Sequence, residues 1–382
     1  MTELSKIPFN KPFIIGKELY NIAETILRGR SSGDGHFTHE CCAMLGSLIQ
    51  SPHVKLVSSC TAALEVTALA LGLGPGDEVI LPSYTYVSTA NAFLLRGVKL
   101  VFVDIRRDTL NIDEKLIAER VTDKTKAILA VHYGGVGCNM PAILETAQKC
   151  GAAVVEDAAQ ALGATYEGKP LGSFGSAGVF SFHETKNCTC GEGGALACND
   201  SALFSRIETI RNRGTNRADF EKGAVDAYTW VDIGSSALSS ELAAAFLHAQ
   251  LERIEEINRS RVASFNYYYE GLAALEEKGY LRRPIIPNEC SHNGHIFYIL
   301  LENEETRAAL IKHLDRRKIH AVFHYVPLHS SPKGRELGNV AEDLPVTEEL
   351  SRRVLRLPMY YELTKEEQNR VIEGIETFFS FR

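Results

Sequence analysis

A lysine follows an apolar segment that could place its amine inside the protein. The segment covers residues 178–182, Lys186 comes four residues later, and a glycine-rich stretch at residues 191–194 lies just beyond. An amine held at the end of a buried strand, beside flexible backbone, is suited to forming a Schiff base with a carbonyl compound. Most lysines are solvated surface charges, so the pattern around Lys186 favours the ordinary interpretation when it is taken alone.

A second apolar segment, at residues 153–156, also ends in polar side chains. Asp157 follows it directly, and Gln160 lies three residues further on. The simplest role for Asp157 is to cap a following helix. Together with Lys186 it indicates different chemistry, because pyridoxal phosphate needs a carboxylate against its ring nitrogen and a lysine for the Schiff base and for proton transfer.

Small residues with hydroxyl groups form a third candidate group. Ser59, Cys60 and Thr61 stand at the start of an amphipathic helical pattern. Free N–H groups at a helix start can hold a phosphate, although an ordinary N-cap explains this segment equally well. Tyr86 follows another apolar run, so its ring could cover a planar cofactor or pack in the core. With Ser181 beside Lys186, the three groups together predict a pyridoxal phosphate site.

Six apolar segments are predicted to be strands of one open α/β sheet. Helical patterns at residues 61–71, 87–95 and 140–150 lie between several of them. This alternation predicts a largely parallel sheet that is covered by helices on both faces. Ligands bind beyond the carboxyl ends of such strands, where Asp157 and Lys186 would lie. The predicted strands are residues 78–81, 98–103, 126–131, 153–156, 178–182 and 194–198.

The C-terminal part of the chain predicts a smaller α+β domain. We expect a large domain at residues 1–255 and a small domain at residues 256–382. Two long helices, at residues 239–257 and 262–277, would connect them. Beyond these we expect strands at residues 295–301 and 320–323, helices at 304–317, 347–355 and 365–379, and loops at 284–287 and 327–338.

Composition excludes several classes of function. The 382 residues carry a net charge of −7, which argues against a nucleic-acid footprint. No apolar run approaches the length of about 20 residues that a membrane span needs. The nine cysteines are scattered and lack zinc-type spacing, so no metal is expected. Without a signal peptide pattern, reduced thiols in the cytoplasm are the expected state.

Motifs along nearly the whole chain resemble those of one enzyme family. The sequence is similar to the sugar-nucleotide branch of the fold-type I, pyridoxal-phosphate-dependent aminotransferases. This resemblance implies an aspartate-aminotransferase-like fold, with a large mixed-sheet domain and a smaller C-terminal α+β domain. The matching segments are residues 8–12, 33–35, 59–64, 82–91, 131–135, 156–160, 180–187, 191–194 and 323–329.

The resemblance also implies roles for individual residues. Lys186 would form the Schiff base and move the proton, Asp157 would pair with the pyridinium nitrogen, and Gln160 would approach the phenolic oxygen. In many relatives an asparagine from the neighbouring subunit contacts the phosphate, and this chain has Ser236 at that position. The resemblance therefore also implies a homodimer with shared active sites. The other implied cofactor residues are Tyr86 on the ring face and Ser59, Cys60, Thr61 and Ser181 on the phosphate.

Candidates for the substrate are less specific. His183, His324, Tyr325 and His329 lie in the matching segments and could contact a sugar nucleotide. A structural role is at least as well supported for each histidine.

The sequences of residues 183–187, 228–230 and 234–236 are most similar to those of dTDP-4-amino-4,6-dideoxygalactose transaminases. The implied reaction transfers the amino group of L-glutamate to C4 of dTDP-4-dehydro-6-deoxyglucose, for bacterial surface polysaccharide. Alternatives are a ketosugar with the carbonyl at C3, a gluco product, a sugar dehydratase or a non-catalytic sugar-nucleotide sensor. Dehydratases of this scaffold carry histidine in place of Lys186, which argues against that alternative.

Overall fold

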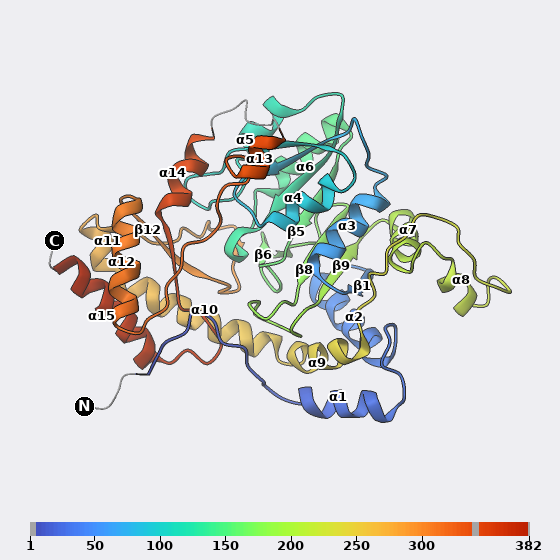
Figure 1. The fold of residues 1–382 in the computed structure, drawn as a ribbon, viewed down its shortest axis with the longest axis horizontal. Coiled ribbons are helices and arrows are strands. Elements are labelled where there is room, and N and C mark those ends of the chain that lie inside the picture. Colours follow the sequence, from blue (N-terminus) through green and yellow to red (C-terminus); the bar gives the residue numbers. More distant parts are fainter. Residues whose placement is uncertain (1–4, 338–343, 381–382) are drawn as a thin grey trace.

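A seven-stranded sheet forms the centre of the molecule (Figure 1). The computed structural model describes residues 5–337 and 344–380. The strand order is β1-β9-β8-β5-β4-β2-β3, and β9 alone runs against its neighbours. The strands are β1 (His53–Val57), β2 (Glu78–Pro82), β3 (Lys99–Val103), β4 (Thr125–Val131), β5 (Ala153–Asp157), β8 (Ala177–Ser181) and β9 (Gly194–Cys198).

Helices cover both faces of this sheet. Alternate residues of a strand face opposite sides, so Val79 packs with Leu64 and Phe93 while Ile80 packs with Ile143 behind the sheet. Burial on both sides explains why these strands are almost continuously apolar. The first face carries α3 (Cys60–Ala70), α4 (Val87–Leu94) and α7 (Ser201–Arg211). The second carries α2 (His36–Ile49), α5 (Glu114–Ile117), α6 (Met140–Cys150) and α9 (Glu241–Leu251).

The remaining N-terminal elements lie outside these layers. Helix α1 (Glu18–Leu27) packs against α9, and α8 (Arg217–Glu221) lies on an arm that projects from the body of the molecule (Figure 1). A small sheet at the periphery joins β6 (Thr165–Tyr166), β7 (Lys169–Pro170) and β11 (Cys290–Ser291). Two 3-10 turns, Ala118–Arg120 and Tyr133–Gly135, complete this part of the chain.

A three-stranded sheet organises the C-terminal part. One face of β12 places Phe297 and Ile299 in a core formed with α10, α12 and α15, and the other places Tyr298 against Tyr84 and Tyr133 of the large-sheet part. The strands are β10 (Leu281–Arg282), β12 (Phe297–Leu301) and β13 (Val354–Leu357). The helices are α10 (Ile254–Gly271), α11 (Ala273–Glu277), α12 (Glu304–Arg316), α13 (Pro332–Glu336), α14 (Pro345–Arg353) and α15 (Lys365–Ser380). No helix in the described residues is both long and apolar enough to cross a membrane.

The prediction of a large mixed α/β sheet with a smaller α+β part is confirmed. All six strands predicted for the large sheet are present, each within one residue at either end. The edge strand β1 was not predicted, because its half-buried and buried residues alternate over only five positions. The domain boundary near residue 255 stays a prediction, since α10 begins beside the large sheet and ends in the core of the small one.

Two predictions in the C-terminal part are wrong. Residues 320–323 form no strand and contribute only one isolated bridge, at Val322, next to a second one at Ile319. The third strand is β13, whose first two residues fall within the helix predicted at 347–355. Helix α14 ends at Arg353 because Val354 turns to extended backbone, so that Val354 and Leu355 enter different apolar clusters.

The predicted helix boundaries around residue 258 are also wrong. The chain breaks at Arg253 (φ −119°, ψ 12°), and α10 then continues through the predicted interruption. It continues because Ile257 and Arg261 on that segment are both buried. The loop predicted over 327–338 contains α13, which begins with a Ser331 cap and a proline at its first position, a typical helix start.

Candidate active site

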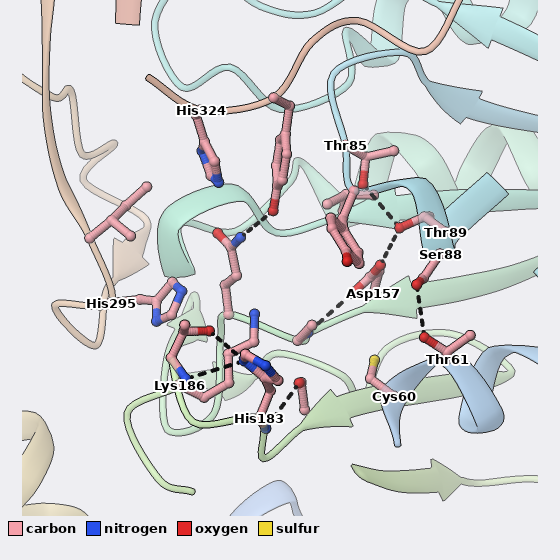
Figure 2. A pocket seen from close by; sticks show the side chains of 18 of the residues that line it. Cys60, Thr61, Thr85, Ser88, Thr89, Asp157, His183, Lys186, His295 and His324 are labelled. Atoms are coloured by element: carbon pink, nitrogen blue, oxygen red, sulfur yellow. Dashed lines mark hydrogen bonds between the residues drawn. The ribbon is translucent and has the colours of Figure 1, made fainter. Parts of the chain in front are cut away.

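A cavity of about 550 Å³ opens beyond the carboxyl ends of β2, β5 and β8. Lys186, Asp157, His295 and His324 project into the same space, although they come from distant parts of the chain (Figure 2). The cavity therefore lies where ligands bind in open α/β sheets. The predicted site residues that line it are Ser59, Cys60, Thr61, Tyr86, Asp157, Gln160, Ser181, His183, Lys186, His324 and Tyr325.

Asp157 is fixed in one orientation at the end of β5. Its Oδ2 accepts a hydrogen bond from Thr89 Oγ1 at 2.8 Å, and its Oδ1 accepts one from the backbone N–H of Ala159 at 3.2 Å. The side chain is buried. A carboxylate held in this way can pair with a protonated ring nitrogen without first reorganising.

The amine of Lys186 faces Asp157 from the turn after β8. The backbone N–H of Lys186 donates to His183 O at 2.9 Å, which fixes the turn. Burial lowers the pKa of the Lys186 ammonium, the Asp157 carboxylate opposes this effect, and the Arg356 guanidinium adds to it. A lowered pKa increases the fraction of Lys186 that is present as the neutral, nucleophilic amine at a given pH.

The start of α3 presents backbone N–H groups to the cavity. Ser59 is the N-cap, and its Oγ accepts from Ala62 N at 3.1 Å. Thr61 Oγ1 donates to Ser88 Oγ at 2.8 Å, so the first turn is also tied to α4. Burial raises the pKa of the Cys60 thiol well above its ordinary value, so the thiol stays neutral. This helix start is suited to an anion such as phosphate.

Gly194 allows β9 to pass directly against this helix start. A Cβ at Gly194 would lie 2.4 Å from Ser59 C and 2.5 Å from Cys60 N. We expect Gly194→Ala to destabilise the protein by about 1–3 kcal/mol. The displaced helix start should also raise the Kd for pyridoxal phosphate at least about tenfold, as the loss of one hydrogen bond to a charged group would.

Spectrophotometric titration of the apoprotein and chemical denaturation would measure the two effects of Gly194→Ala. The matched control is Gly74→Ala, because a Cβ at Gly74 meets nothing within 4 Å. Unchanged cofactor affinity in Gly194→Ala would contradict the prediction.

Gln160 and Tyr325 form the opposite side of the cavity. Gln160 Oε1 accepts from Gly134 N at 2.7 Å, and its Nε2 donates to the Tyr325 hydroxyl at 2.8 Å. Tyr86 precedes α4 and remains 58 % exposed at the mouth, with its ring 6.3 Å from that of Tyr325. A planar ring between Asp157 and the mouth would therefore meet an amide on one edge and aromatic side chains beside it.

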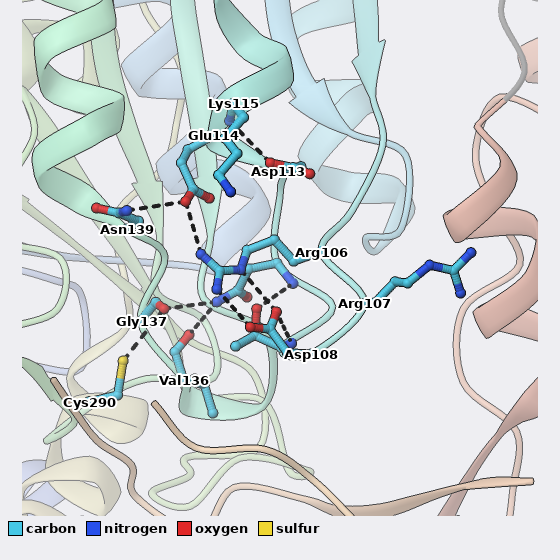
Figure 3. Close-up of polar contacts among 12 residues, drawn as sticks. Arg106, Arg107, Asp108, Asp113, Glu114, Lys115, Val136, Gly137, Asn139 and Cys290 are labelled. Atoms are coloured by element: carbon cyan, nitrogen blue, oxygen red, sulfur yellow. Dashed lines mark hydrogen bonds and ion pairs between the residues drawn. The ribbon is translucent and has the colours of Figure 1, made fainter. Parts of the chain in front are cut away.

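A polar network joins the loop after β3 to the turn after β4 (Figure 3). Arg106 pairs with Asp108 at 2.6 Å and with Glu114 at 2.9 Å, which closes the loop after β3. Within that loop, Asn111 donates to Val136 O and Gly137 O and accepts from Tyr133 N. These contacts therefore fix the turn that contains Gly134, and this turn holds the side chain of Gln160.

The histidines predicted to meet substrate differ in position. His183 lines the cavity, but its Nδ1 contacts Thr185 Oγ1 at 2.9 Å and accepts from Thr185 N, so it also holds the lysine turn. His324 lines the cavity and contacts the Tyr133 hydroxyl through Nδ1 at 2.7 Å. His329 lies outside the lining, between Ser83 Oγ at 2.6 Å and Glu348 at 3.3 Å.

Ser236 does not reach the cavity of its own chain. It is exposed and pairs with Asn212 through an isolated bridge next to the projecting arm. The resemblance placed this residue in the site of a neighbouring subunit, so its role stays a prediction.

The structure adds residues that the sequence did not single out. Arg261, His295 and Arg356 line the cavity from the C-terminal part, and Asn10 lines it from the N-terminal segment. Arg261, His295 and Arg356 lie outside the matching segments, whereas Asn10 lies within the matching segment 8–12 but was assigned no role there. The strands and helices predicted around them do not indicate on which side their side chains lie.

Three poorly solvated histidines of the C-terminal part predict a loss of stability in mild acid. Burial lowers the pKa of His292 to about 4 and keeps the pKa values of His295 and His324 well below the ordinary value. Unfolded histidines bind protons below about pH 6.5. The unfolded state therefore gains protons that the folded state does not, and the free energy of unfolding should fall from pH 7 to pH 5, by up to about 1.4 kcal/mol per pH unit for each such histidine.

Urea midpoints at pH 7, 6 and 5 would measure this fall. His324→Asn should show a shallower dependence than the unmodified protein, because one of the three groups is removed. Equal midpoints across this pH range would contradict the prediction.

Taken together, the cavity fits pyridoxal phosphate. An amine, a carboxylate fixed for a ring nitrogen, an anion-binding helix start and exposed aromatic rings all border one space.

Known proteins are similar to this chain in both sequence and fold. Residues 14–376 match the DegT/DnrJ/EryC1/StrS aminotransferase family. The chain is 33 % identical to the spore coat polysaccharide biosynthesis protein SpsC of Bacillus subtilis, over 97 % of this chain and 96 % of that protein. The crystal structure of the aminotransferase TlmJ from Streptoalloteichus hindustanus superposes with a TM-score of 0.90 at 29 % identity, covering 98 % and 99 % of the two chains. NtdA from Bacillus subtilis, solved with bound cofactor PMP, gives a TM-score of 0.89 at 29 % identity, over 99 % of this chain and 86 % of that one.

Proposed function

Because the chain belongs to the DegT/DnrJ/EryC1/StrS aminotransferase family, we propose that it transfers the amino group of L-glutamate to C4 of dTDP-4-dehydro-6-deoxy-D-glucose. The products would be dTDP-4-amino-4,6-dideoxy-D-galactose and 2-oxoglutarate. The protein is a pyridoxal-phosphate-dependent sugar aminotransferase of the fold-type I architecture. The observation that supports the chemistry is that Lys186 and Asp157 face one cavity beside the start of α3.

Different residues of the chain would have different roles in the reaction. When bound, pyridoxal phosphate supplies a carbonyl for the donor amine and a ring that accepts electrons. Asp157 would keep a proton on the ring nitrogen, and the amine of Lys186 would take a proton from the donor carbon and return it on the acceptor side. Gln160 would donate to the phenolic oxygen, and Tyr86 would cover the ring and exclude water.

The identity of the sugar substrate is inferred from similarity to one subfamily. Residues 183–187, 228–230 and 234–236 are most similar to the dTDP-4-amino-4,6-dideoxygalactose transaminases, and SpsC is itself named for polysaccharide biosynthesis. We therefore assign the product to bacterial surface polysaccharide of the enterobacterial common antigen or O-antigen type. The nine free cysteines agree with a reducing compartment, and we place the reaction in the cytoplasm.

We also propose that the enzyme is a homodimer with shared active sites. Tyr228, Trp230 and Val231 are exposed on the arm next to Ser236, and Trp230 is 78 % exposed. Exposed aromatic side chains such as Tyr228 and Trp230 are enriched at interfaces. Light scattering should give the mass of two chains, and a monomer at assay concentration would contradict this part.

One experiment tests the proposed reaction. The holoenzyme is incubated with dTDP-4-dehydro-6-deoxyglucose and L-glutamate, and NMR assigns the configuration at C4 of the product, with Lys186→Ala as the inactive control. An axial amino group supports the proposal. An equatorial amino group would indicate a gluco product, and transfer only to a 3-ketosugar would indicate the other alternative. A purified protein that binds no pyridoxal phosphate would favour a sensor.

A further inference from the structure

The residue next to Lys186 fixes one histidine of the cavity wall. Asn187 Nδ2 donates to Asn258 Oδ1 and to Asn293 O, both at 2.9 Å. Asn293 O is a backbone carbonyl and can only accept, so this contact identifies the nitrogen of the Asn187 amide. Asn187 Oδ1 then lies 2.9 Å from His295 Nδ1. Because an amide oxygen only accepts, Nδ1 of His295 carries a proton.

The second ring nitrogen of His295 is therefore an acceptor. Burial lowers the pKa of His295 well below its ordinary value. Three cations near the ring, Lys186, Arg261 and Arg356, act in the same direction, so the imidazole is neutral. A neutral imidazole carries one ring proton, and in His295 that proton is on Nδ1. Nε2 holds a lone pair and has no hydrogen to donate.

The backbone that carries this ring is anchored to the segment after β5. Asn293 Nδ2 donates to Gln160 O at 3.0 Å and to Leu162 O at 3.1 Å. Asn293 Oδ1 accepts from His295 N at 3.1 Å. Gly135 (φ +80°) permits this arrangement, because a Cβ there would collide with Asn293 Oδ1. The imidazole is thus held both through its backbone and through Nδ1, as a preorganised binding group must be.

Nε2 of His295 is the nitrogen left to face the cavity. The residue is 6 % exposed and lines the space that Lys186 and Asp157 also border (Figure 2). Within residues 5–337 and 344–380, the hydrogen bonds of the ring are confined to Nδ1. A buried acceptor without a donor is unfavourable, and a ligand that supplies an O–H or N–H group removes this penalty.

We propose that His295 Nε2 accepts a hydrogen bond from the C3 hydroxyl of the ketosugar, an inference that rests on the proposed function. L-Glutamate carries two carboxylates, which only accept, and its amine is the group that bonds to the cofactor. The sugar carries O–H donors, and the hydroxyl at C3 is on the carbon next to the reacting carbonyl. His295 shares the cavity with Lys186, so the hydroxyl nearest to the reacting carbon fits.

The two half-reactions test this role separately. The holoenzyme is mixed with L-glutamate, and the amine-loaded enzyme is mixed with dTDP-4-dehydro-6-deoxyglucose, while the absorbance of lysine-bound cofactor reports both reactions. We expect His295→Asn to lower the second-order rate constant with the ketosugar about tenfold or more, since a buried hydroxyl loses its acceptor. The rate constant with glutamate should be unchanged, which also shows that the variant is folded and binds its cofactor.

A pair of substitutions separates binding from a structural role. In His295→Asn the new amide N–H can replace Nδ1–H against Asn187, but no acceptor reaches the position of Nε2. The longer side chain in His295→Gln can place its oxygen there, so this variant should react with the ketosugar faster than His295→Asn. If the ring only held Asn187, the order would be reversed and the proposal would fall. The control His53→Asn should match the unmodified protein, because His53 begins β1 at the sheet edge opposite the cavity.

An altered sugar identifies the hydroxyl. With the unmodified protein, the analogue that lacks the C3 hydroxyl should react at least about tenfold more slowly than the complete ketosugar. In His295→Asn the two sugars should react at similar rates, because the partner of the hydroxyl is already missing. The same penalty for the analogue in both proteins would overturn the contact.

The protonation of the ring can be measured without any substrate. Nitrogen-15 NMR of holoenzyme labelled in its histidines should show a protonated Nδ1 and an unprotonated Nε2 for the signals that His295→Asn lacks. A proton on Nε2 would overturn the acceptor role. A glutamate reaction slowed as much as the ketosugar reaction would also overturn it, because His295 would then act on Lys186. An unmodified enzyme that reacts with glutamate but not with the 4-ketosugar would instead overturn the sugar in the proposed function, so the two failures are distinguishable.

Discussion

Lys186→Ala is expected to lower kcat by about 10⁴-fold or more, the upper range for the loss of a group that acts as a general acid and base. The amine of Lys186 faces the fixed carboxylate of Asp157 in the cavity, and among residues 5–337 and 344–380 no other lysine lines it. The variant therefore loses both the covalent attachment of the cofactor and the proton carrier. The absorbance of lysine-bound pyridoxal phosphate should also be absent.

A control separates this effect from a general loss of charge. Lys149→Ala removes a lysine whose side chain is 72 % exposed and pairs only with Glu145, so it should leave activity and absorbance unchanged. Added small amines should restore part of the activity of Lys186→Ala, because they can carry the proton in the space that the side chain leaves. Full activity of Lys186→Ala without such an amine would contradict the assignment.

The large sheet was predictable from sequence because its strands are buried on both faces. Residues such as Val79, Ile80 and Leu81 are all apolar, whichever side they face, so the whole strand stands out from its surroundings. Asp157 and Lys186 could then be placed at the carboxyl ends of their strands. The site residues that could be predicted are therefore those that follow directly after these strands.

The C-terminal contribution to the site could not be predicted in the same way. Val354 follows α14 without a proline or glycine, so a helical pattern runs on into the strand that carries Arg356. Only the long-range pairing of β13 with β12 shows that the backbone is extended there. The direction of Arg356 depends on that pairing, because a helix would have pointed it elsewhere.

The sequence also could not distinguish histidines in the cavity from histidines in the framework. His324 and His329 stand five residues apart in one matching segment. His324 lines the cavity, whereas His329 is held by Ser83 outside the lining. The two histidines differ in position because residues 325–328 turn back toward the large sheet, where Leu328 N donates to Ser83 O. The composition of this segment does not indicate such a turn.

Asp157→Asn is expected to lower kcat by about 10³-fold, comparable with the loss of one preorganised electrostatic group in an active site. The amide keeps the shape of the carboxylate, and its oxygen can still accept from Thr89. It carries no negative charge, so it would no longer hold a proton on the ring nitrogen, and the ring would accept electrons poorly. Rapid mixing with L-glutamate would measure the fall in the donor half-reaction, with Thr89→Val as the comparison for loss of the hydrogen bond alone.

Rescue by a modified cofactor distinguishes the charge of Asp157 from its contribution to structure. Pyridoxal phosphate methylated at the ring nitrogen carries a permanent positive charge, and Asp157→Ala leaves space for the methyl group. The methylated cofactor should therefore raise the rate of Asp157→Ala and should not raise that of the unmodified protein, in which the carboxylate already keeps the nitrogen charged. If Asp157 only capped the chain through Ala159 N, the methylated and ordinary cofactors would give Asp157→Ala the same rate, and the proposed electrostatic role would fall.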